Sequence, residues 1–315
     1  KVSIDTDSIQ YENDDVMRPI YGDDYAIACC VSAMKLGKQM QFFGARCNLA
    51  KLMLIAINGG YDTTSGLHIG PQMPVLAGDT LDYDTFVARF DIYLAWLAKL
   101  YVNTMNVIHY MHDKYAYEKV QMGLHDTFVE RLMAFGIAGL SVVADSFVAV
   151  DHLLRERPAD AENLIAACAS DFKGYEELRD YLKACPKYGN NLPEADEEAA
   201  TVAKRVADRV ASMKNYLGNP FRPDFSSPST HLTYGYWVGA TPDGRPAREM
   251  MGYGIDPLFS NADGGLGFRT LSAMQLPFCK MNGGCASHFG IDPKYFTAES
   301  MEERGVQFYE RVVRP

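Results

Sequence analysis

The sequence predicts an α/β fold with buried parallel strands, and three features of the chain support this. An apolar segment with internal glycines at 132–140 is typical of a buried strand that leaves into a tight turn, and a helical segment at about 143–154 follows it. A second, amphipathic helix is predicted at 194–216. Alternating strands and helices favour a parallel sheet covered by helices. Because no linker or repeat divides the chain, we expect residues 1–315 to lie in one domain.

The first part of the chain is expected to hold a short strand and a helix. Residues 1–24 are largely polar and predict a loop, whereas the apolar run at 25–31 predicts a strand or a tight loop. Residues 46–57 predict a helix that ends at Asn58-Gly59-Gly60, since glycine accepts the left-handed conformation that closes helices. A loop rich in glycine, proline and threonine is expected at 61–80.

A long helix is expected next, running to about Tyr117. Asp82 or Asp84 can cap it, because a short carboxylate accepts hydrogen bonds from the free amides of the first turn. The helical period is carried by Phe86, Phe90, Tyr93, Leu94, Leu97 and Tyr101. We expect this helix to pack on the outside of a sheet.

The second half of the chain is less regular outside the helix at 194–216, which is acidic at its start and basic at its end, as the helix dipole favours. Residues 158–191 have no sustained period and predict surface structure. After Tyr216 we expect short strands and a turn at Thr241-Pro242-Asp243-Gly244. The glycine cluster at 263–267 lacks the spacing of a nucleotide-binding signature and predicts a loop.

Composition argues against several classes of protein. The formal net charge of −10 would repel a phosphate backbone, so we expect no nucleic-acid partner. No stretch approaches the roughly 18 to 20 apolar residues that span a bilayer, and residues 1–10 hold no secretory signal, so we expect no membrane partner. The seven cysteines are odd in number and scattered, unlike a disulfide framework. These features predict a reduced, cytoplasmic protein.

The adjacent cysteines Cys29 and Cys30 are the main candidates for chemistry. Neighbours on a strand point to opposite faces, so such a pair could pass a reactive group across a loop. Taken alone, two small buried side chains would be the more ordinary interpretation. A zinc site is disfavoured, because no two cysteines are separated by a two-residue gap. His109, His112 and Asp113 superficially suggest a metal site, but no further ligand stands out, so we expect none.

The residues around this pair carry a resemblance that changes the interpretation. They read Asp24-Tyr25-Ala26-Ile27-Ala28-Cys29-Cys30-Val31-Ser32, followed by Gly37-Lys38-Gln39-Met40-Gln41-Phe42-Phe43-Gly44-Ala45-Arg46. Together they closely resemble the active-site segment of the pyruvate formate-lyases, a family of glycyl-radical enzymes. Further matches lie at 3–6, 10–15, 48–51, 56–60, 108–115, 136–141 and 144–146. The turn at 241–245 resembles one shared more widely among glycyl-radical enzymes, and beyond Phe278 no resemblance is evident.

The resemblance implies a fold and a reaction. The fold would be a ten-stranded α/β barrel of the glycyl-radical enzyme type, of which this chain would hold a part, including the cysteine-bearing loop. The reaction would be an acyl transfer that cleaves pyruvate with coenzyme A to acetyl-CoA and formate. By position, Cys30 would be the thiol that meets the glycyl radical, and Cys29 would attack the carbonyl carbon of pyruvate and carry the acetyl group. No metal would take part.

The resemblance also implies binding residues and partners. Arg46 matches an arginine that holds the pyruvate carboxylate, a task suited to the guanidinium fork, although an ion pair at a helix start is the ordinary alternative. Phe43 matches an aromatic residue beside the substrate, and could equally be part of a core. His125 matches a position near the adenine of coenzyme A, and could equally be structural. A radical-SAM activating enzyme and a homodimeric complete enzyme are further expectations.

The cysteine pair separates the branches of the superfamily. Dehydratases and decarboxylases resemble one another in a single cysteine followed two places later by a glutamate that acts as acid or base. Here Val31 and Ser32 stand two places after Cys29 and Cys30. Elimination chemistry would therefore lack its proton shuttle, whereas radical cleavage with acyl transfer needs none.

Three functions stay open at this point. The family's radical loop, approximately Arg-Val-Ser-Gly-Tyr, and the first half of its barrel have no counterpart in these residues, so the glycyl radical is expected from a segment absent from this chain. The chain could be a segment of a complete acyltransferase, or a non-catalytic scaffold beside a chain that carries the radical. A lyase for 2-oxobutanoate is the third possibility, because one methylene changes binding by only about 1 to 3 kcal/mol.

Overall fold

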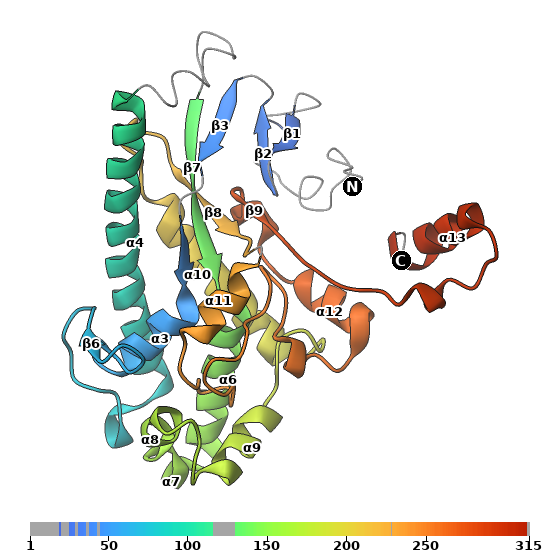
Figure 1. Ribbon diagram of the computed structural model, residues 1–315. Helices are drawn as coiled ribbons and strands as arrows, with labels where there is room; N and C mark the ends of the chain where they lie inside the picture. Colours follow the sequence, from blue (N-terminus) through green and yellow to red (C-terminus); the bar gives the residue numbers. More distant parts are fainter. Residues whose placement is uncertain are drawn as a thin grey trace.

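Figure 1 shows the computed structural model of the protein, which describes Pro19 and residues 25–28, 31–35, 38–42, 45–115, 130–227 and 229–313. Among these residues a five-stranded sheet forms the centre of the fold. All of its pairings are parallel, as the alternation of strands and helices predicted. Its strands are β3 (Gln39–Phe42), β4 (Arg46–Asn48), β7 (Glu130–Ala138), β8 (Phe221–Phe225) and β9 (Gly284–Cys285).

Strand β7 organises this sheet. Strand β3 pairs with the first residues of β7, and β4 pairs with its last residues. Strand β7 also pairs with β8, and β8 pairs with β9. The predicted strand at 132–140 corresponds to β7, and its residues from Leu132 to Ala138 are buried. A continuous apolar strand of this kind is expected where both faces of a parallel sheet are covered.

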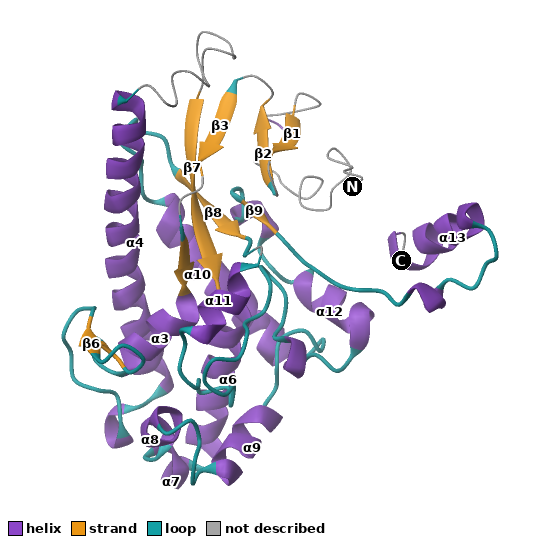
Figure 2. Cartoon of the chain, in the orientation of Figure 1, coloured by secondary structure: helices purple, strands orange, loops and turns teal. Residues whose placement is uncertain are grey.

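Long helices pack against the sheet (Figure 2). Phe147 of α6 lies edge-on to Phe86 and Phe90 of α4, with ring centroids 4.9 and 5.5 Å apart, and all three side chains are fully buried. Tyr101 of α4 donates a hydrogen bond to the Ala134 carbonyl of β7 at 3.0 Å. These contacts confirm that the long helix packs on the outside of a sheet. The helices are α3 (Leu49–Ile57), α4 (Tyr83–Lys114), α6 (Leu140–Glu156) and α10 (Pro193–Ala211).

The local signals at the ends of these helices are confirmed in part. Asp82 accepts a hydrogen bond from the Thr85 amide at 2.8 Å and caps α4. Gly59 and Gly60, with φ of 64° and 100°, close α3. The predicted start of α3 at Arg46 is wrong, because residues 46–48 pair with β7 and the helix begins after Asn48, whose side chain accepts from the Lys51 amide. Pairing with a distant strand overrode the local helical pattern.

Residues 158–191 depart from the prediction of surface structure. They form α7 (Pro158–Ala161), α8 (Leu164–Ala169) and α9 (Glu176–Ala184), and they bury Leu164, Phe172, Leu182 and Tyr188. Each helix spans too few turns to show a sustained period. The predicted loop at 263–267 is also wrong, since α12 (Gly265–Ala273) begins within it.

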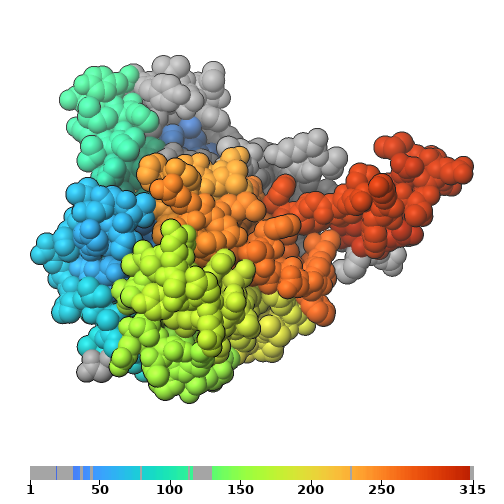
Figure 3. Space-filling model, turned by 60° about the horizontal axis from the view of Figure 1, so that its bottom comes forward, coloured from blue at the N-terminus to red at the C-terminus, as the bar shows by residue number. Residues whose placement is uncertain are grey.

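The remaining elements are short. The turn at 241–244 is confirmed by a hydrogen bond from the Gly244 amide to the Thr241 carbonyl at 3.0 Å. A segment that contains α13 projects from the body of the molecule (Figure 3). None of the helices in the described part of the chain is long and apolar enough to cross a bilayer. The short elements are β1 (Tyr25–Ala28), β2 (Ser32–Lys35), β5 (Tyr61–Asp62), β6 (Leu67–His68), α11 (Thr230–Tyr236) and α13 (Met301–Phe308).

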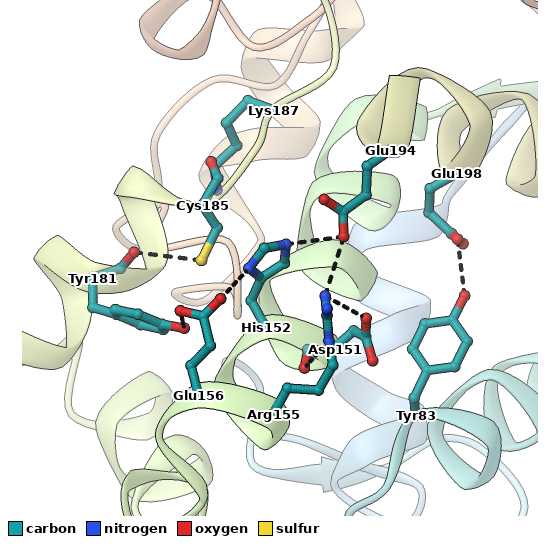
Figure 4. Close-up of polar contacts among 10 residues, drawn as sticks. All are labelled: Tyr83, Asp151, His152, Arg155, Glu156, Tyr181, Cys185, Lys187, Glu194 and Glu198. Atoms are coloured by element: carbon teal, nitrogen blue, oxygen red, sulfur yellow. Dashed lines mark hydrogen bonds and ion pairs between the residues drawn. The ribbon is translucent and has the colours of Figure 1, made fainter. Parts of the chain in front are cut away.

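A polar network joins α6, α9 and α10 (Figure 4). His152 lies between two carboxylates, with its ring nitrogens 2.9 Å from oxygens of Glu156 and Glu194. Arg155 reaches Glu194 at 3.2 Å, and the Tyr181 hydroxyl donates to Glu156 at 2.9 Å. Because the carboxylates are exposed, these contacts orient the helices and contribute little to stability.

Candidate functional site

Of the five predicted site residues, the structure describes one, Arg46. Cys29, Cys30, Phe43 and His125 fall outside the described residues, so their predicted roles stay predictions. Arg46 is described, half-buried, on β4. It lies on this strand shortly before α3 begins, and its predicted role as a carboxylate ligand stays a prediction.

Arg46 belongs to a row of residues that crosses the sheet. It pairs with Gly136 of β7, which pairs with Asp224 of β8, which pairs with Gly284 of β9. Paired residues on neighbouring strands direct their side chains to the same face of a sheet. The face that carries the Arg46 side chain therefore also carries Asp224, with a glycine beside each of them.

The first glycine leaves room for the arginine. A Cβ atom at Gly136 would lie 2.4 Å from the Cγ atom of Arg46 and 2.6 Å from the Ala45 carbonyl oxygen. The arginine stem thus crosses β7 toward β8. There its Nε donates a hydrogen bond to the Ser226 carbonyl at 2.5 Å, and its Nη2 lies 3.4 Å from the Ser226 hydroxyl.

Asp224 gives this site its electrostatic character. The residue is fully buried, and burial raises the pKa of its carboxyl to about 6, although contacts with Ser226 and the charge of Arg46 act in the opposite direction. The guanidinium and this carboxylate partly balance each other near neutral pH. Nη1 of Arg46 has no hydrogen-bond partner among the described residues.

The segment that follows the cysteines lies beside this row. Strands β1 and β2 pair antiparallel with Ala28 opposite Ser32, and Cys29 and Cys30 fall between them in the sequence. A Cβ atom at Gly284 would lie 2.4 Å from Val31, so Val31 packs directly on β9. Nη1 of Arg222 donates to the Ala33 carbonyl at 3.0 Å, which joins β2 to β8.

Sequence reasoning missed several of these residues. Ser32 and Gln41 lie within the segments that resemble the family, but no role was assigned to them. Asp224 gave no local signal, because its importance comes from pairing across the sheet. The adjacent glycines Gly283 and Gly284 are the kind of signal that indicates a close backbone approach, and they lie where no resemblance was evident.

The histidines of α4 pack against aromatic rings. His109 is 2% exposed, and its ring centroid lies 4.6 Å from that of Phe42 and 5.9 Å from that of His112. Among the described residues no three His, Cys, Asp or Glu side chains gather as metal ligands would. An open groove of about 590 Å³ runs between α4 and the β4–α3 segment, and its lining is mostly apolar.

Comparisons with known proteins agree on one family. Residues 1–235 match the family model described as pyruvate formate lyase-like. The chain is 43% identical over 312 residues to a formate acetyltransferase of Haemophilus influenzae. The matched region covers 96% of this chain and 40% of that protein. The similarity therefore extends past Phe278, and the chain spans less than half the length of this relative.

Solved structures share the fold. A glycyl radical enzyme from Archaeoglobus fulgidus superposes with a TM-score of 0.78 at 22% identity, over 90% of this chain and 37% of that one. A protein from Roseburia inulinivorans, solved in work on 1,2-propanediol dehydration, superposes with a TM-score of 0.82 at 22% identity, over 92% of this chain and 38% of that one. The B12-independent glycerol dehydratase from Clostridium butyricum superposes with a TM-score of 0.76 at 25% identity, over 83% of this chain and 35% of that one.

Proposed function

Because the chain belongs to the pyruvate formate lyase-like family and its parallel sheet is part of a glycyl-radical enzyme α/β barrel, we propose that the complete protein cleaves pyruvate with coenzyme A to acetyl-CoA and formate. Residues 1–315 would lie in that barrel domain. The chain spans 40% of the length of the formate acetyltransferase it resembles, so the reaction is proposed for the complete protein.

The row from Arg46 to Gly284 is the observation that best supports this proposal. Arg46 crosses Gly136 to reach β8, and Val31 packs on Gly284 one strand further on. Neighbouring strands are about 4.8 Å apart, so the guanidinium lies within about two strand spacings of the residue that follows Cys30. A small carboxylate held by Arg46 would thus face the cysteine-bearing segment.

The chemistry then follows from the thiol pair. The glycyl radical of the complete protein would supply the unpaired electron by taking a hydrogen atom from the Cys30 thiol. Hydrogen exchange between the two thiols moves the radical to Cys29, whose sulfur bonds to the carbonyl carbon of pyruvate. The bond from that carbon to the carboxylate breaks, which leaves an acetyl thioester on Cys29. The carboxylate fragment would then take a hydrogen atom from the Cys30 thiol and leave as formate, which returns the radical to Cys30. The thiol of coenzyme A would exchange with the thioester, so that acetyl-CoA leaves and the Cys29 thiol is restored.

The structure offers a reason to prefer this reaction over a dehydration. Two places after the cysteines, where the dehydratases are expected to carry a glutamate, this chain has Val31 and Ser32. Valine carries no titratable group, and Ser32 is fixed by hydrogen bonds. Its hydroxyl donates to the Gly283 carbonyl at 3.2 Å and accepts from Gln41 at 2.6 Å. A hydroxyl held in this way, with a high intrinsic pKa, is a poor proton shuttle for elimination.

Further partners follow from the proposed reaction. Phe43 would lie beside pyruvate, and His125 near the adenine of coenzyme A. A radical-SAM activating enzyme would introduce the glycyl radical, and the complete protein would act as a homodimer. No step of the proposed reaction requires a metal ion.

The test uses the complete natural protein, activated and assayed without oxygen. It should release formate and acetyl-CoA in equal amounts from pyruvate and coenzyme A. Cys29→Ser and Cys30→Ser should each abolish formate release, whereas Cys279→Ser, a change at an exposed cysteine, should retain it. Turnover by either variant of the pair, or activity that survives in air, would contradict the radical relay.

A further inference from the structure

Three groups form a closed set of hydrogen bonds directly after the cysteines. Nε2 of Gln41 donates to the Ser32 hydroxyl at 2.6 Å and to the Gly283 carbonyl at 2.9 Å. The Ser32 hydroxyl donates to the same carbonyl at 3.2 Å. The groups come from β2, from β3 and from the residue that precedes β9, so this network joins three parts of the chain that are distant in sequence.

The chemistry of the groups fixes the orientation of the glutamine. A carbonyl oxygen can only accept hydrogen bonds, so the amide nitrogen of Gln41, and not its oxygen, must face Gly283. Ser32 and Gly283 are fully buried or nearly so, and Gln41 is 8% exposed. In such surroundings each lost partner leaves a polar group without compensation, which makes the network rigid.

The side-chain oxygen of Gln41 takes no part in this network. This atom, Oε1, is buried and has no hydrogen-bond partner among the described residues. A side chain that served packing alone would carry no such atom, since an apolar residue would fill the same space without the cost of burying it. Together with its two donated hydrogen bonds, this buried oxygen indicates that Gln41 is present for its polar groups and not for packing alone.

Gly283, which precedes β9, and Gly284, its first residue, bring the network close to Val31. Gly283 lies against the backbone of β8, where a Cβ atom would be 2.5 Å from the Pro223 carbonyl oxygen. Gly284, with φ of +117°, leaves the space that Val31 occupies. Val31 is therefore held by packing on Gly284, and Ser32 is held by its hydrogen bond to the adjacent residue Gly283.

We propose that Ser32 and Gln41 are positioning residues for the Cys29–Cys30 pair: through Gly283 they fix the point at which the cysteine-bearing segment leaves the sheet. The consequence for turnover rests on the proposed function. Loss of the network should let the thiols move relative to Arg46, so that pyruvate still binds but its carbonyl carbon is attacked more slowly.

Gln39 offers a matched control. It lies on the same strand two residues earlier, on the same face, and is also a glutamine with two hydrogen bonds. Its Nε2 donates to Glu130 at 2.6 Å and its Oε1 accepts from the Lys35 amide at 3.0 Å. Lys35 pairs with Tyr25, at the end of the β1–β2 pair away from the cysteines.

The experiment compares Gln41→Met, Ser32→Ala and Gln39→Met in the complete activated protein. Gln41→Met and Ser32→Ala should each lower kcat for formate release at least tenfold, with the KM for pyruvate changed less than twofold. Gln39→Met should change neither by more than twofold. The double variant should lose no more than the worse single variant, because both changes break one network. Ser32→Ala decides the question if Gln41→Met does not fold.

A second measurement does not depend on turnover. Alkylation of Cys29 and Cys30 by iodoacetamide in the non-activated protein, followed by mass spectrometry, should be at least threefold faster in Gln41→Met than in Gln39→Met. Wild-type kcat and alkylation rates in both network variants would overturn the positioning role and leave the proposed function intact. If the network variants are alkylated faster but the activated wild-type protein releases no formate, the proposed function alone is overturned.

Discussion

The side chain of Arg46 crosses the sheet directly over Gly136, where a single added methyl group would lie 2.4 Å from its Cγ atom. The two residues are paired across β4 and β7, and the arginine continues to Ser226 beyond β8. The absence of a side chain at residue 136 is therefore what allows the guanidinium to lie on the sheet next to Asp224.

Replacing Gly136 by alanine should displace Arg46, because the neighbouring Ala45 carbonyl belongs to backbone that cannot move easily. We expect the KM for pyruvate to rise at least tenfold, and the free energy of unfolding to fall by about 1 to 3 kcal/mol, as is typical of overpacking. Gly267→Ala is the control, because a Cβ atom there would meet nothing within 4 Å. Steady-state kinetics and denaturant unfolding of the complete protein measure both effects.

Replacing Arg46 by lysine should weaken pyruvate binding more than coenzyme A binding. Lysine keeps the charge but cannot place two parallel N–H groups on a carboxylate, and it loses the hydrogen bond to the Ser226 carbonyl. The apparent KM for pyruvate should rise by at least tenfold, with the KM for coenzyme A changed less than threefold. An unchanged pyruvate constant would remove the carboxylate role from this residue.

Replacing Asp224 by asparagine should change how stability depends on pH. Burial raises the pKa of this carboxyl to about 6 in the folded protein, above the value of about 3.9 in an unfolded chain. The folded state therefore holds the proton more tightly, and Asp224 lowers the free energy of unfolding as pH rises from about 4 to about 6. The variant should gain stability relative to wild type over that window, by on the order of 2 kcal/mol.

Urea unfolding of the complete protein at pH 4 and pH 7 measures this difference. The aspartate and the asparagine have nearly the same volume, so packing should contribute equally at the two pH values. A difference between variant and wild type that stays constant with pH would show that Asp224 does not titrate in this range.

Replacing Phe147 by alanine should destabilise the helical layer. Its ring contacts Phe86 and Phe90 edge-on and is fully buried, so its removal leaves a cavity between α4 and α6. The expected loss is about 3 to 5 kcal/mol. Phe259→Ala, at a phenylalanine that is 83% exposed, should change stability by less than about 0.5 kcal/mol. Thermal unfolding of the two variants side by side distinguishes a core role from a general effect of losing a ring.

Several helices and strands of this protein follow from patterns of neighbouring residues in the sequence. The period from Phe86 to Tyr101 and the cap at Asp82 predicted α4, and the apolar run with Gly136 predicted β7. Hydrogen bonds within a helix and apolar alternation along a chain involve near neighbours, so a short window of residues carries them. The resemblance around Cys29 and Cys30 identified the family for the same reason, since that segment is continuous.

Only the tertiary structure decided the rest. Residues 46–48 form a strand because β7 lies beside them, and residues 158–191 are ordered by what they bury. The contact of Ser32 with Gly283 joins residues 251 positions apart, and that of Arg46 with Ser226 joins residues 180 apart. Such contacts depend on how the strands are ordered in the sheet, which no local pattern specifies. The candidate site residues are therefore visible in the sequence, whereas the glycines and polar groups that contact Arg46, Val31 and Ser32 come together only on folding.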